Sequence, residues 1–412
     1  MCSCHAILNN HQYRIYSFHI YFTSRVVCST HQSNDEVSIM RIFITFLVAL
    51  SALVGTAFAG QKAPGKVLMV VSSYGVDQGE TQPGFEFDEL AKAYLVFAAN
   101  GLSIDIASPK GGAVEADKYN PEKAYNAQFL ADPDAVNKLN NTLNLSAVKS
   151  QHYNAIFVVG GKGAMFDFHN NQALQMLVAD IYQRNGIVSA VCHGPAALVN
   201  VKLANGDYLV SGKRVNGFTN EEEKAFGKKW APKFEFMLES KLIERGASFE
   251  KAPMMLKHVA VDGNLVTGQN PFSTAATAIE VVKAMGIKPV AMKPFKDDAT
   301  IELAAQMLTD VKPAAAELAA HTERYQPELI AMYGYYRMMF AASKSDLQQA
   351  VNLMEVGRLY MDNPQLIIAL AQGYQKLDDV ASAKQRLTEL LQRNPKFEPA
   401  QTLLAKLEQS KQ

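Results

Sequence analysis

The stretch IVSAVCHGPAAL, residues 187–198, decides the fold, because a short apolar run leads directly into a tight turn. Ile187–Val191 is apolar apart from one serine and has the length of a buried β-strand. Pro195 suits the first turn of a helix, where its missing N–H is not needed. The stretch therefore predicts a strand, a turn at Cys192 and a helix over Pro195–Val201.

The turn at Cys192 has the features of a nucleophile elbow. Ala190 and Gly194 lie two residues before and two residues after the cysteine, where small residues let an exposed side chain clear the backbone. The N-terminus of the following helix is expected to favour the thiolate and to lower the pKa of Cys192. The alternative is a buried cysteine that fills the end of a strand, which is a common role for this residue.

Outward from this turn, apolar runs alternate with helical patterns from Lys66 onward. Such alternation predicts an α/β fold, with a mostly parallel sheet sandwiched by helices, and we assign residues 60–290 to it. The expected strands are Val67–Ser72, Ser103–Ser108, Ala155–Val159, Ile187–Val191 and Leu265–Gly268. The other expected helices are Phe85–Asn100, Ala173–Arg184 and Ser273–Met285.

An all-α domain is expected over residues 291–412, where strand patterns stop and a helical period continues. Counted from Pro364, the small, aromatic and proline positions are similar to a tetratricopeptide repeat and fall on Ala371, Tyr374, Ala383 and Pro395. A looser copy begins at Pro327. The alternative is a helical bundle that caps the first domain, since about three repeats are usually needed for stability.

Residues 40–59 have the pattern of a secretory signal peptide. Arg41 follows Met40, an apolar run comes next, and Ala57 and Ala59 form an A-x-A cleavage pattern. Cleavage after Ala59 would release the chain into the periplasm or the medium. The alternative is a membrane anchor, but no stop-transfer charges adjoin the run. Residues 1–39 precede a complete signal sequence, so we expect them to be a mis-assigned upstream extension rather than a domain.

Composition narrows the function classes. The chain has 40 Lys and Arg against 40 Asp and Glu, which leaves no cationic excess for binding nucleic acid. Three of the four cysteines lie within residues 1–39, so the exported chain would keep only Cys192, which cannot form an internal disulfide. Cys2, Cys4 and His5 match no zinc-ligand spacing. We therefore expect no metal site.

Two acidic positions are candidates for proton transfer. Glu89 falls on the same helical stripe as Phe85, Ala93 and Val96, where burial would raise its pKa and suit it to move protons near neutral pH. The alternative is a solvent-facing glutamate. The run Glu221–Glu223 follows Asn220 and is equally typical of the acidic first turn of a helix.

Six stretches, in order, resemble the ThiJ/PfpI superfamily, in the branch that contains glyoxalase III and the Hsp-type stress chaperones. They are GFEFDELAKAY from Gly84, ASPKGG from Ala107, GGKGAMFDF from Gly160, AVCHGPAAL from Ala190, NGFTNEEE from Asn216 and VTGQNPFSTA from Val266. The likeness spans about Lys66 to Ile287. It implies a class I glutamine amidotransferase-like, flavodoxin-like sandwich that is often dimeric, and we expect a homodimer.

The resemblance implies a set of site residues. Cys192 matches the family nucleophile, His193 the histidine that follows it, and Glu89 the glutamate that lies five residues after a glycine. The third triad acid falls within NGFTNEEE, with Glu223 the first choice by spacing and Glu222 the second. Gly160 and Gly161 match the oxyanion and substrate-binding segment, with the His193 N–H as a further donor. Lys162 departs from the GGHG that relatives usually carry.

The activity that the resemblance implies is a cofactor-independent glyoxalase III, or D-lactate dehydratase-like, reaction. A 2-oxoaldehyde such as methylglyoxal would add to Cys192 as a hemithioacetal and leave as a 2-hydroxy acid. Two alternatives stay open. A cysteine amidase or peptidase would use the same Cys192 and His193, and a stress chaperone or envelope interaction protein would bind a protein partner at its helical repeats.

Overall fold

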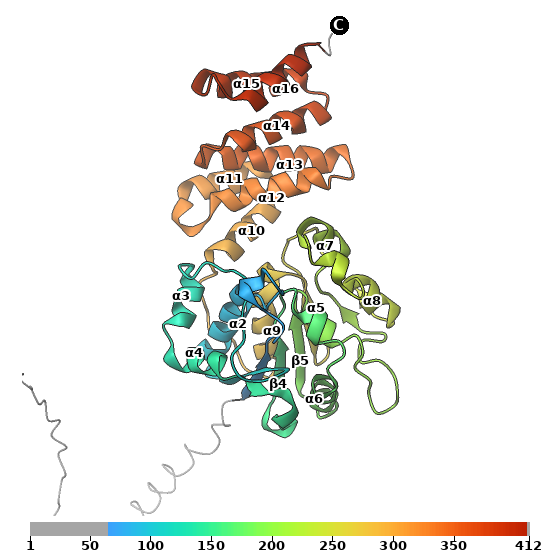
Figure 1. Cartoon of the computed structure of the whole chain (residues 1–412). Coiled ribbons are helices and arrows are strands. Elements are labelled where there is room, and N and C mark those ends of the chain that lie inside the picture. The colour runs from blue at the N-terminus through green and yellow to red at the C-terminus, as the bar shows by residue number, and fades with distance from the viewer. Residues whose placement is uncertain (1–64, 410–412) are drawn as a thin grey trace, which may run out of the picture. The chain divides into compact units, whose positions relative to one another are not determined.

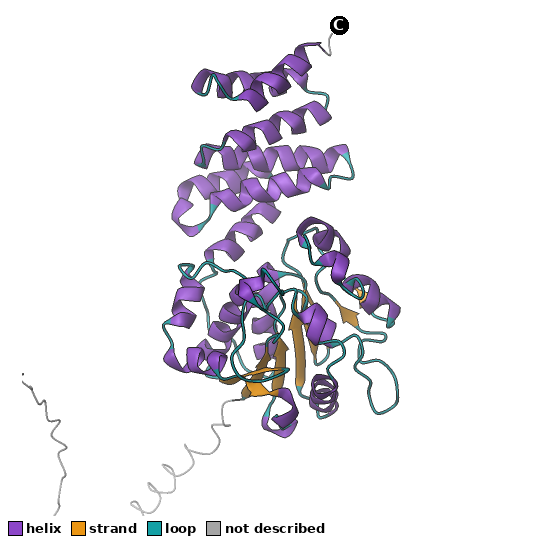
Figure 2. Ribbon diagram, viewed as in Figure 1, coloured by secondary structure: helices purple, strands orange, loops and turns teal. Residues whose placement is uncertain are grey.

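The computed structural model of the chain describes residues 65–409, drawn in Figure 1 by position and in Figure 2 by secondary structure. The predicted signal peptide, the upstream extension and the early cysteines lie outside the described residues. In the part that is described, no helix is long and apolar enough to cross a membrane.

Seven strands form the main sheet, in the order β3-β2-β1-β4-β5-β9-β8. All neighbouring pairs are parallel except β8 and β9, which confirms the mostly parallel sheet. The side chains of β4, β5 and β9 are buried along the whole strand, and burial on both faces explains the continuous apolar runs. The strands are β1 Lys66–Val70, β2 Ser103–Ser108, β3 Leu143–Asn144, β4 Ala155–Val158, β5 Ile187–Val191, β8 Val259–Asp262 and β9 Leu265–Gly268.

Helices pack around this sheet, as Figure 2 shows. α2 (Phe87–Ala99) and α9 (Thr274–Ala284) contact each other, and α6 (Gln172–Gln183) contacts β4 and β5. α2 ends before Gly101, whose φ of +71° is the left-handed conformation that glycine adopts most easily after a helix. The shorter elements are α3 Ala124–Leu130, α4 Pro133–Asn140, α5 Ala164–Asp167, α7 Asn220–Phe226, α8 Leu238–Glu244, and the strand pair β6 Arg214–Val215 and β7 Ser248–Phe249.

The prediction of a helix over Pro195–Val201 is wrong. Only Gly194–Ala197 is helical, as a single 3-10 segment named η4. The chain then turns back on itself, because the Leu209 N–H donates to the Val201 carbonyl at 2.9 Å and Lys202 forms an isolated bridge with Tyr208. These contacts use the backbone groups that a continued helix would need.

Beyond residue 295 the described chain forms helices joined by short loops and contains no strand. In most of this region, helices that follow one another in the sequence pack side by side in antiparallel directions (Figure 1). The most extensive contacts are those of α12 with α13 and of α14 with α15. The helices are α10 Lys296–Met307, α11 Val311–Ala320, α12 Pro327–Met339, α13 Lys344–Gly357, α14 Pro364–Lys376, α15 Val380–Arg393 and α16 Glu398–Gln409.

The helical region shares a core with the α/β part. Leu256, which precedes β8, is buried in one cluster with Ile301 and Leu303 of α10 and Ile330 of α12. A second cluster holds α13, α14 and α15 together. The two parts therefore bury apolar surface against each other, which stabilises the contact by the hydrophobic effect.

Gly334 lies at a close approach between α12 and α13. A Cβ at this position would lie 2.8 Å from the Ala350 carbonyl and 2.9 Å from the Leu353 Cβ. We expect Gly334→Val to lower the free energy of unfolding by about 1–3 kcal/mol through overpacking. Urea unfolding followed by circular dichroism measures this effect.

Ala319→Val is the matched control, because it places the same side chain at an exposed position of α11. It should cost only the few tenths of a kcal/mol of helix propensity. Equal losses in the two variants would contradict the close packing at Gly334.

Candidate active site

Cys192 lies at the carboxyl end of β5 with a φ of +60°. Residues other than glycine rarely adopt this conformation, so the turn must be held by its surroundings. The Cys192 N–H donates to the Gly268 carbonyl at 2.9 Å, and the Cys192 carbonyl accepts from the Phe218 N–H at 2.7 Å. Both backbone groups of the strained residue are thus hydrogen-bonded to neighbouring segments.

The residues around the turn must be small because neighbouring segments lie very close to the backbone there. A Cβ on Gly194 would lie 2.4 Å from the Val158 carbonyl oxygen at the end of β4. A Cβ on Gly160 would lie 2.7 Å from Glu89 Oε2 and 2.8 Å from the Cys192 Cβ. Glycine at these two positions lets β4, β5 and the start of α2 meet at one point.

His193 connects the thiol to a carboxylate. Its Nδ1 lies 3.4 Å from Cys192 Sγ, and its Nε2 lies 2.8 Å from Glu223 Oε2. The ring is buried and packs against Phe218, with 4.5 Å between ring centroids. The structure therefore brings Cys192, His193 and Glu223 into one hydrogen-bonded line, which is the geometry of a nucleophile, a base and an orienting acid.

The three glutamates of NGFTNEEE have different surroundings. Glu221 is exposed, whereas Glu222 and Glu223 are buried. Glu222 forms a capping box with Thr219 at the start of α7. Its carboxylate also accepts hydrogen bonds from the Met255 N–H and from two side-chain amides, those of Gln269 and Asn270. Of the three, only Glu223 reaches His193.

Glu89 is fully buried in the first turn of α2, so it is not a solvent-facing residue. Its Oε2 accepts the Gly160 N–H at 2.8 Å, no group among residues 65–409 bonds its Oε1, and the Cys192 side chain lies beside it. Burial raises the pKa of Glu89 well above its usual range, and the negative charge of Glu86 raises it further. Both effects favour the protonated carboxyl of Glu89 over its carboxylate.

The expectation of a lowered cysteine pKa is wrong. Burial raises the pKa of Cys192, and the Glu89 carboxylate beside it raises it further. No long helix follows the turn, so the expected helix dipole is missing. The thiol loses its proton most easily when Glu89 holds one, since a protonated Glu89 removes the repulsion and donates a hydrogen bond. Cys192 and Glu89 are therefore one unit that shares a proton.

The structure corrects the predicted role of Gly160, which lies in the glycine segment after β4. The Gly160 N–H already donates to Glu89, so it is not a donor for an oxyanion. Gly161 has a φ of +92°, and a Cβ there would lie 2.4 Å from the Glu86 backbone nitrogen. Within residues 65–409 no acceptor bonds the N–H of Gly161 or of His193. These two N–H groups remain available for a developing negative charge.

Sequence reasoning missed a second carboxyl near the site. Glu86 lies three residues before Glu89, and burial together with Asp88 raises its pKa to about 7. The positive charge of Lys162 opposes this shift, and it also opposes the raised pKa of Asp117. The Glu86–Glu89 spacing, one helical turn, was the available signal. Lys162, the departure from the usual GGHG, thus lies among acidic groups at the edge of the site.

Sequence reasoning also missed an aromatic group on the His193 side. Phe166 stacks on Tyr74 with 4.5 Å between centroids and meets Trp230 and Phe234 edge-on. Phe234 also contacts the His193 ring.

No group of three or more His, Cys, Asp or Glu residues that could hold a metal ion occurs in the described part of the chain.

The different surroundings of Glu221, Glu222 and Glu223 predict different stabilities for their glutamine variants. Glu222→Gln turns an amide toward donors, so it should lower the free energy of unfolding by about 2 kcal/mol. Glu223→Gln keeps an oxygen for His193 and should lose less than about 1 kcal/mol. Urea unfolding at pH 7 measures both variants, with the exposed Glu221→Gln as an unchanged control. A larger loss for Glu223→Gln than for Glu222→Gln would show that the two environments are assigned the wrong way round.

Comparison with known proteins places the α/β part of the chain. The sequence profile of the DJ-1/PfpI family matches residues 81–284. The glutathione-independent glyoxalase hsp3101 of Schizosaccharomyces pombe is 33% identical over 244 residues, covering 53% of this chain and 95% of that protein. Glyoxalase 3 of Candida albicans is 31% identical over 231 residues, covering 53% of this chain and 98% of that protein.

Solved structures give the same result. The Rapid Encystment Protein 24 KDa of Francisella tularensis superposes with a TM-score of 0.51 at 37% identity, covering 54% of this chain and 99% of that one. Glyoxalase III of Candida albicans superposes with a TM-score of 0.50 at 27% identity, covering 53% of this chain and 97% of that one. Each likeness accounts for just over half of the chain.

Proposed function

The chain belongs to the DJ-1/PfpI family, and from that premise we propose that it is a glutathione-independent glyoxalase that converts a 2-oxoaldehyde such as methylglyoxal into a 2-hydroxy acid. The observation that carries the proposal is the placement of a buried Glu89 carboxyl, whose pKa is raised, beside the buried Cys192 thiol. The proposed route needs a nucleophile that binds the aldehyde carbon and a group that takes and returns a proton between the two carbons.

The first step is addition of Cys192 Sγ to the aldehyde carbon. The S–H bond of Cys192 breaks as the Glu89 carboxylate takes its proton, the sulfur–carbon bond forms, and Glu89 passes that same proton to the carbonyl oxygen, which gives a hemithioacetal. The N–H groups of Gly161 and His193 stabilise the negative charge that develops on this oxygen. Glu89 is left as a carboxylate beside the substrate.

The second step moves hydrogen between the two carbons. Glu89 removes the hydrogen of the former aldehyde carbon as a proton, and the electron pair forms the carbon–carbon double bond of an enediol. His193, oriented by Glu223, protonates the oxygen of the second carbon. Glu89 then returns its proton to that carbon, and His193 takes the proton of the hydroxyl on the first carbon. The first carbon is oxidised and the second reduced, so no external oxidant is needed.

The product of these steps is a thioester of Cys192. Water hydrolyses it, which releases the 2-hydroxy acid and restores the thiol. For methylglyoxal the net reaction is addition of one water to give lactate. The residues described above supply every proton transfer from one buried pair and one histidine, without glutathione.

Lactate formation from methylglyoxal by the purified chain, assayed without glutathione, tests this proposal. We expect Cys192→Ala to abolish turnover, because it removes the sulfur that binds the aldehyde carbon. Glu89→Gln should lower kcat by about 10²–10⁴-fold, because it removes the group that carries the proton. Glu221→Gln, an exposed carboxyl on α7, is the control and should keep wild-type turnover. Full activity in Glu89→Gln would exclude the proton-shuttle role. An inactive wild type that hydrolyses amides would favour a cysteine amidase.

We also propose that the chain is exported after cleavage at Ala59, forms a homodimer and binds a protein partner through its helical region. The pattern of residues 40–59 supports export. The tetratricopeptide-like spacing and the antiparallel helices support a partner. A groove of about 600 Å³ between α12 and α14 is lined by apolar and aromatic side chains such as Met332 and Tyr335, by several amides and by the carboxylate of Glu328, and suits an extended, mostly apolar peptide.

Native mass spectrometry of the chain recovered from the periplasm of an expressing bacterium tests these three points together. The expected species is a dimer of chains that start at Gly60, with an added peptide mass that Tyr335→Ala removes. A monomer, an uncleaved chain or a species without added mass would each reject the corresponding point.

A further inference from the structure

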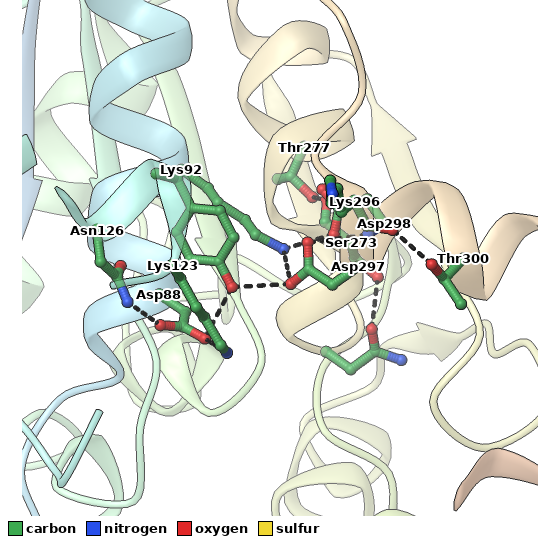
Figure 3. A network of polar contacts seen from close by, with 12 residues as sticks. Asp88, Lys92, Lys123, Asn126, Ser273, Thr277, Lys296, Asp297, Asp298 and Thr300 are labelled. Carbon is green, nitrogen blue, oxygen red and sulfur yellow. Dashed lines mark hydrogen bonds and ion pairs between the residues drawn. The ribbon is translucent and has the colours of Figure 1, made fainter. Parts of the chain in front are cut away.

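The helix that carries Glu89 is fastened to the helical region one turn farther along. Lys92 of α2 is 1% exposed, and its ammonium lies 2.8 Å from Asp297 Oδ2 and 2.5 Å from Asp298 Oδ1 at the start of α10. Figure 3 shows the Lys92 side chain pointing at Asp297 across the space between the two helices. A lysine buried to this degree must be paired, since an isolated buried charge is strongly unfavourable.

Every carboxylate that pairs with Lys92 among residues 65–409 belongs to α10. Aromatic rings surround the same ammonium, with the centroid of Tyr125 at 4.8 Å and those of Phe295 and Phe272 at 5.7 and 5.8 Å. These rings shield the Lys92 ion pair from water, and ionic interactions are stronger in such surroundings than in water. α2 cannot keep Lys92 in this place unless α10 supplies its acids.

A second chain of contacts ties the residue before Glu89 to the same helix. Asp88 accepts hydrogen bonds from Tyr125 and Asn126 and is paired with Lys123. The Tyr125 hydroxyl also lies 2.9 Å from Asp297 Oδ2. Figure 3 shows Asp88 with Lys123 and Asn126 on one side of this network and Asp297 on the other.

The helix that carries Glu223 also contacts the helical region, here through aromatic rings. Phe226 of α7, three residues after Glu223, packs edge-on against Tyr336 of α12 with 4.6 Å between ring centroids. Glu222, next to Glu223, accepts from Asn270, whose amide also donates to the Leu256 carbonyl. Leu256 belongs to the core shared with the helical region.

We propose that the helical region is a positioning element for the site, in which α10 holds α2 and α12 holds α7, so that Glu89 and Glu223 keep their places beside Cys192 and His193. Lys92 and Phe226 are positioning residues of this arrangement. Each lies one helical turn after the carboxylate that it orients, and a helical turn transmits a displacement with little loss. The proposal rests on the proposed function for its kinetic consequences, whereas its effect on the titration of Cys192 needs only Glu89 beside the thiol and no turnover.

The full chain with Lys92→Met provides the first test. Methionine fits the aromatic surroundings but leaves Asp297 and Asp298 unpaired, so α2 should shift. We expect kcat for methylglyoxal to fall about tenfold to a hundredfold with KM changed less than about twofold, because a displacement near 1 Å costs rate rather than binding. Lys92→Arg, which keeps the charge, should recover much of the rate. Phe226→Leu should lower kcat in the same way.

Lys257→Met is the matched control. Lys257 also joins the α/β part to α10, through Glu302 at 3.2 Å, but it is exposed and lies on no helix that carries a site carboxylate. It should keep wild-type kinetics. Equal loss in Lys257→Met and Lys92→Met would show that any break in the contact between the two parts has this effect, and would overturn the assignment to Lys92.

A second readout does not depend on turnover. The rate at which iodoacetamide alkylates Cys192, followed by mass spectrometry of its peptide across pH 6–10, reports the proton shared with Glu89. In Lys92→Met the midpoint should fall toward that of Glu89→Gln, since a displaced carboxylate no longer raises the pKa of Cys192. Lys257→Met should keep the wild-type profile.

These readouts separate the two proposals. A wild type without glyoxalase turnover rejects the proposed function, and the alkylation profiles then decide the positioning role alone. A folded Lys92→Met with the wild-type profile overturns the positioning role. If Lys92→Met does not fold, Asp298→Asn replaces it, because that variant keeps the Lys92–Asp297 pair. It should show a smaller shift in the same direction, and no shift would overturn the inference.

Discussion

The burial of one carboxyl against one thiol is the constraint on which the rest of the site depends. Glu89 and Cys192 cannot both be charged in a space without water, so they share a proton. Bringing them together requires a glycine at Gly160, whose N–H also binds the carboxylate. It also requires the left-handed backbone of Cys192 at the end of β5. Strain at the turn is thus the cost of placing a nucleophile beside its proton carrier.

The parallel sheet explains why these groups can meet. β4 and β5 are neighbours, and their carboxyl ends carry the glycine segment and Cys192 respectively. Loops at the carboxyl edge of such a sheet are where functional groups gather, because the strands hold them rigidly while the loops vary. α7 then adds Glu223 from a segment that lies between β5 and β9 in the sequence. The site is therefore assembled from four separate parts of the α/β fold.

The helical region changes how this fold is supported. The relatives match just over half of the chain, so their likeness accounts for the α/β part and not for residues 296–409. That region supplies the only acids that neutralise Lys92 within the described chain and shares a buried core with it. A buried ion pair adds little net stability but penalises every arrangement that separates its partners. Its effect is to specify one placement of α10 against α2.

Local patterns in the sequence determined five of the seven strands of the main sheet, α2, the helical region and the turn at Cys192, because periodicity and turn chemistry depend on near neighbours. The roles of His193 and Glu89 came from the resemblance to the family. The choice of Glu223 over Glu222 needed the fold, since capping and orientation look alike in a run of three glutamates. The raised pKa of Cys192, the shortened helix after it and the pairing of Lys92 with Asp297 were decided by tertiary structure alone. Each depends on burial beside groups that are distant in the chain, and a sequence does not show which distant groups will become neighbours.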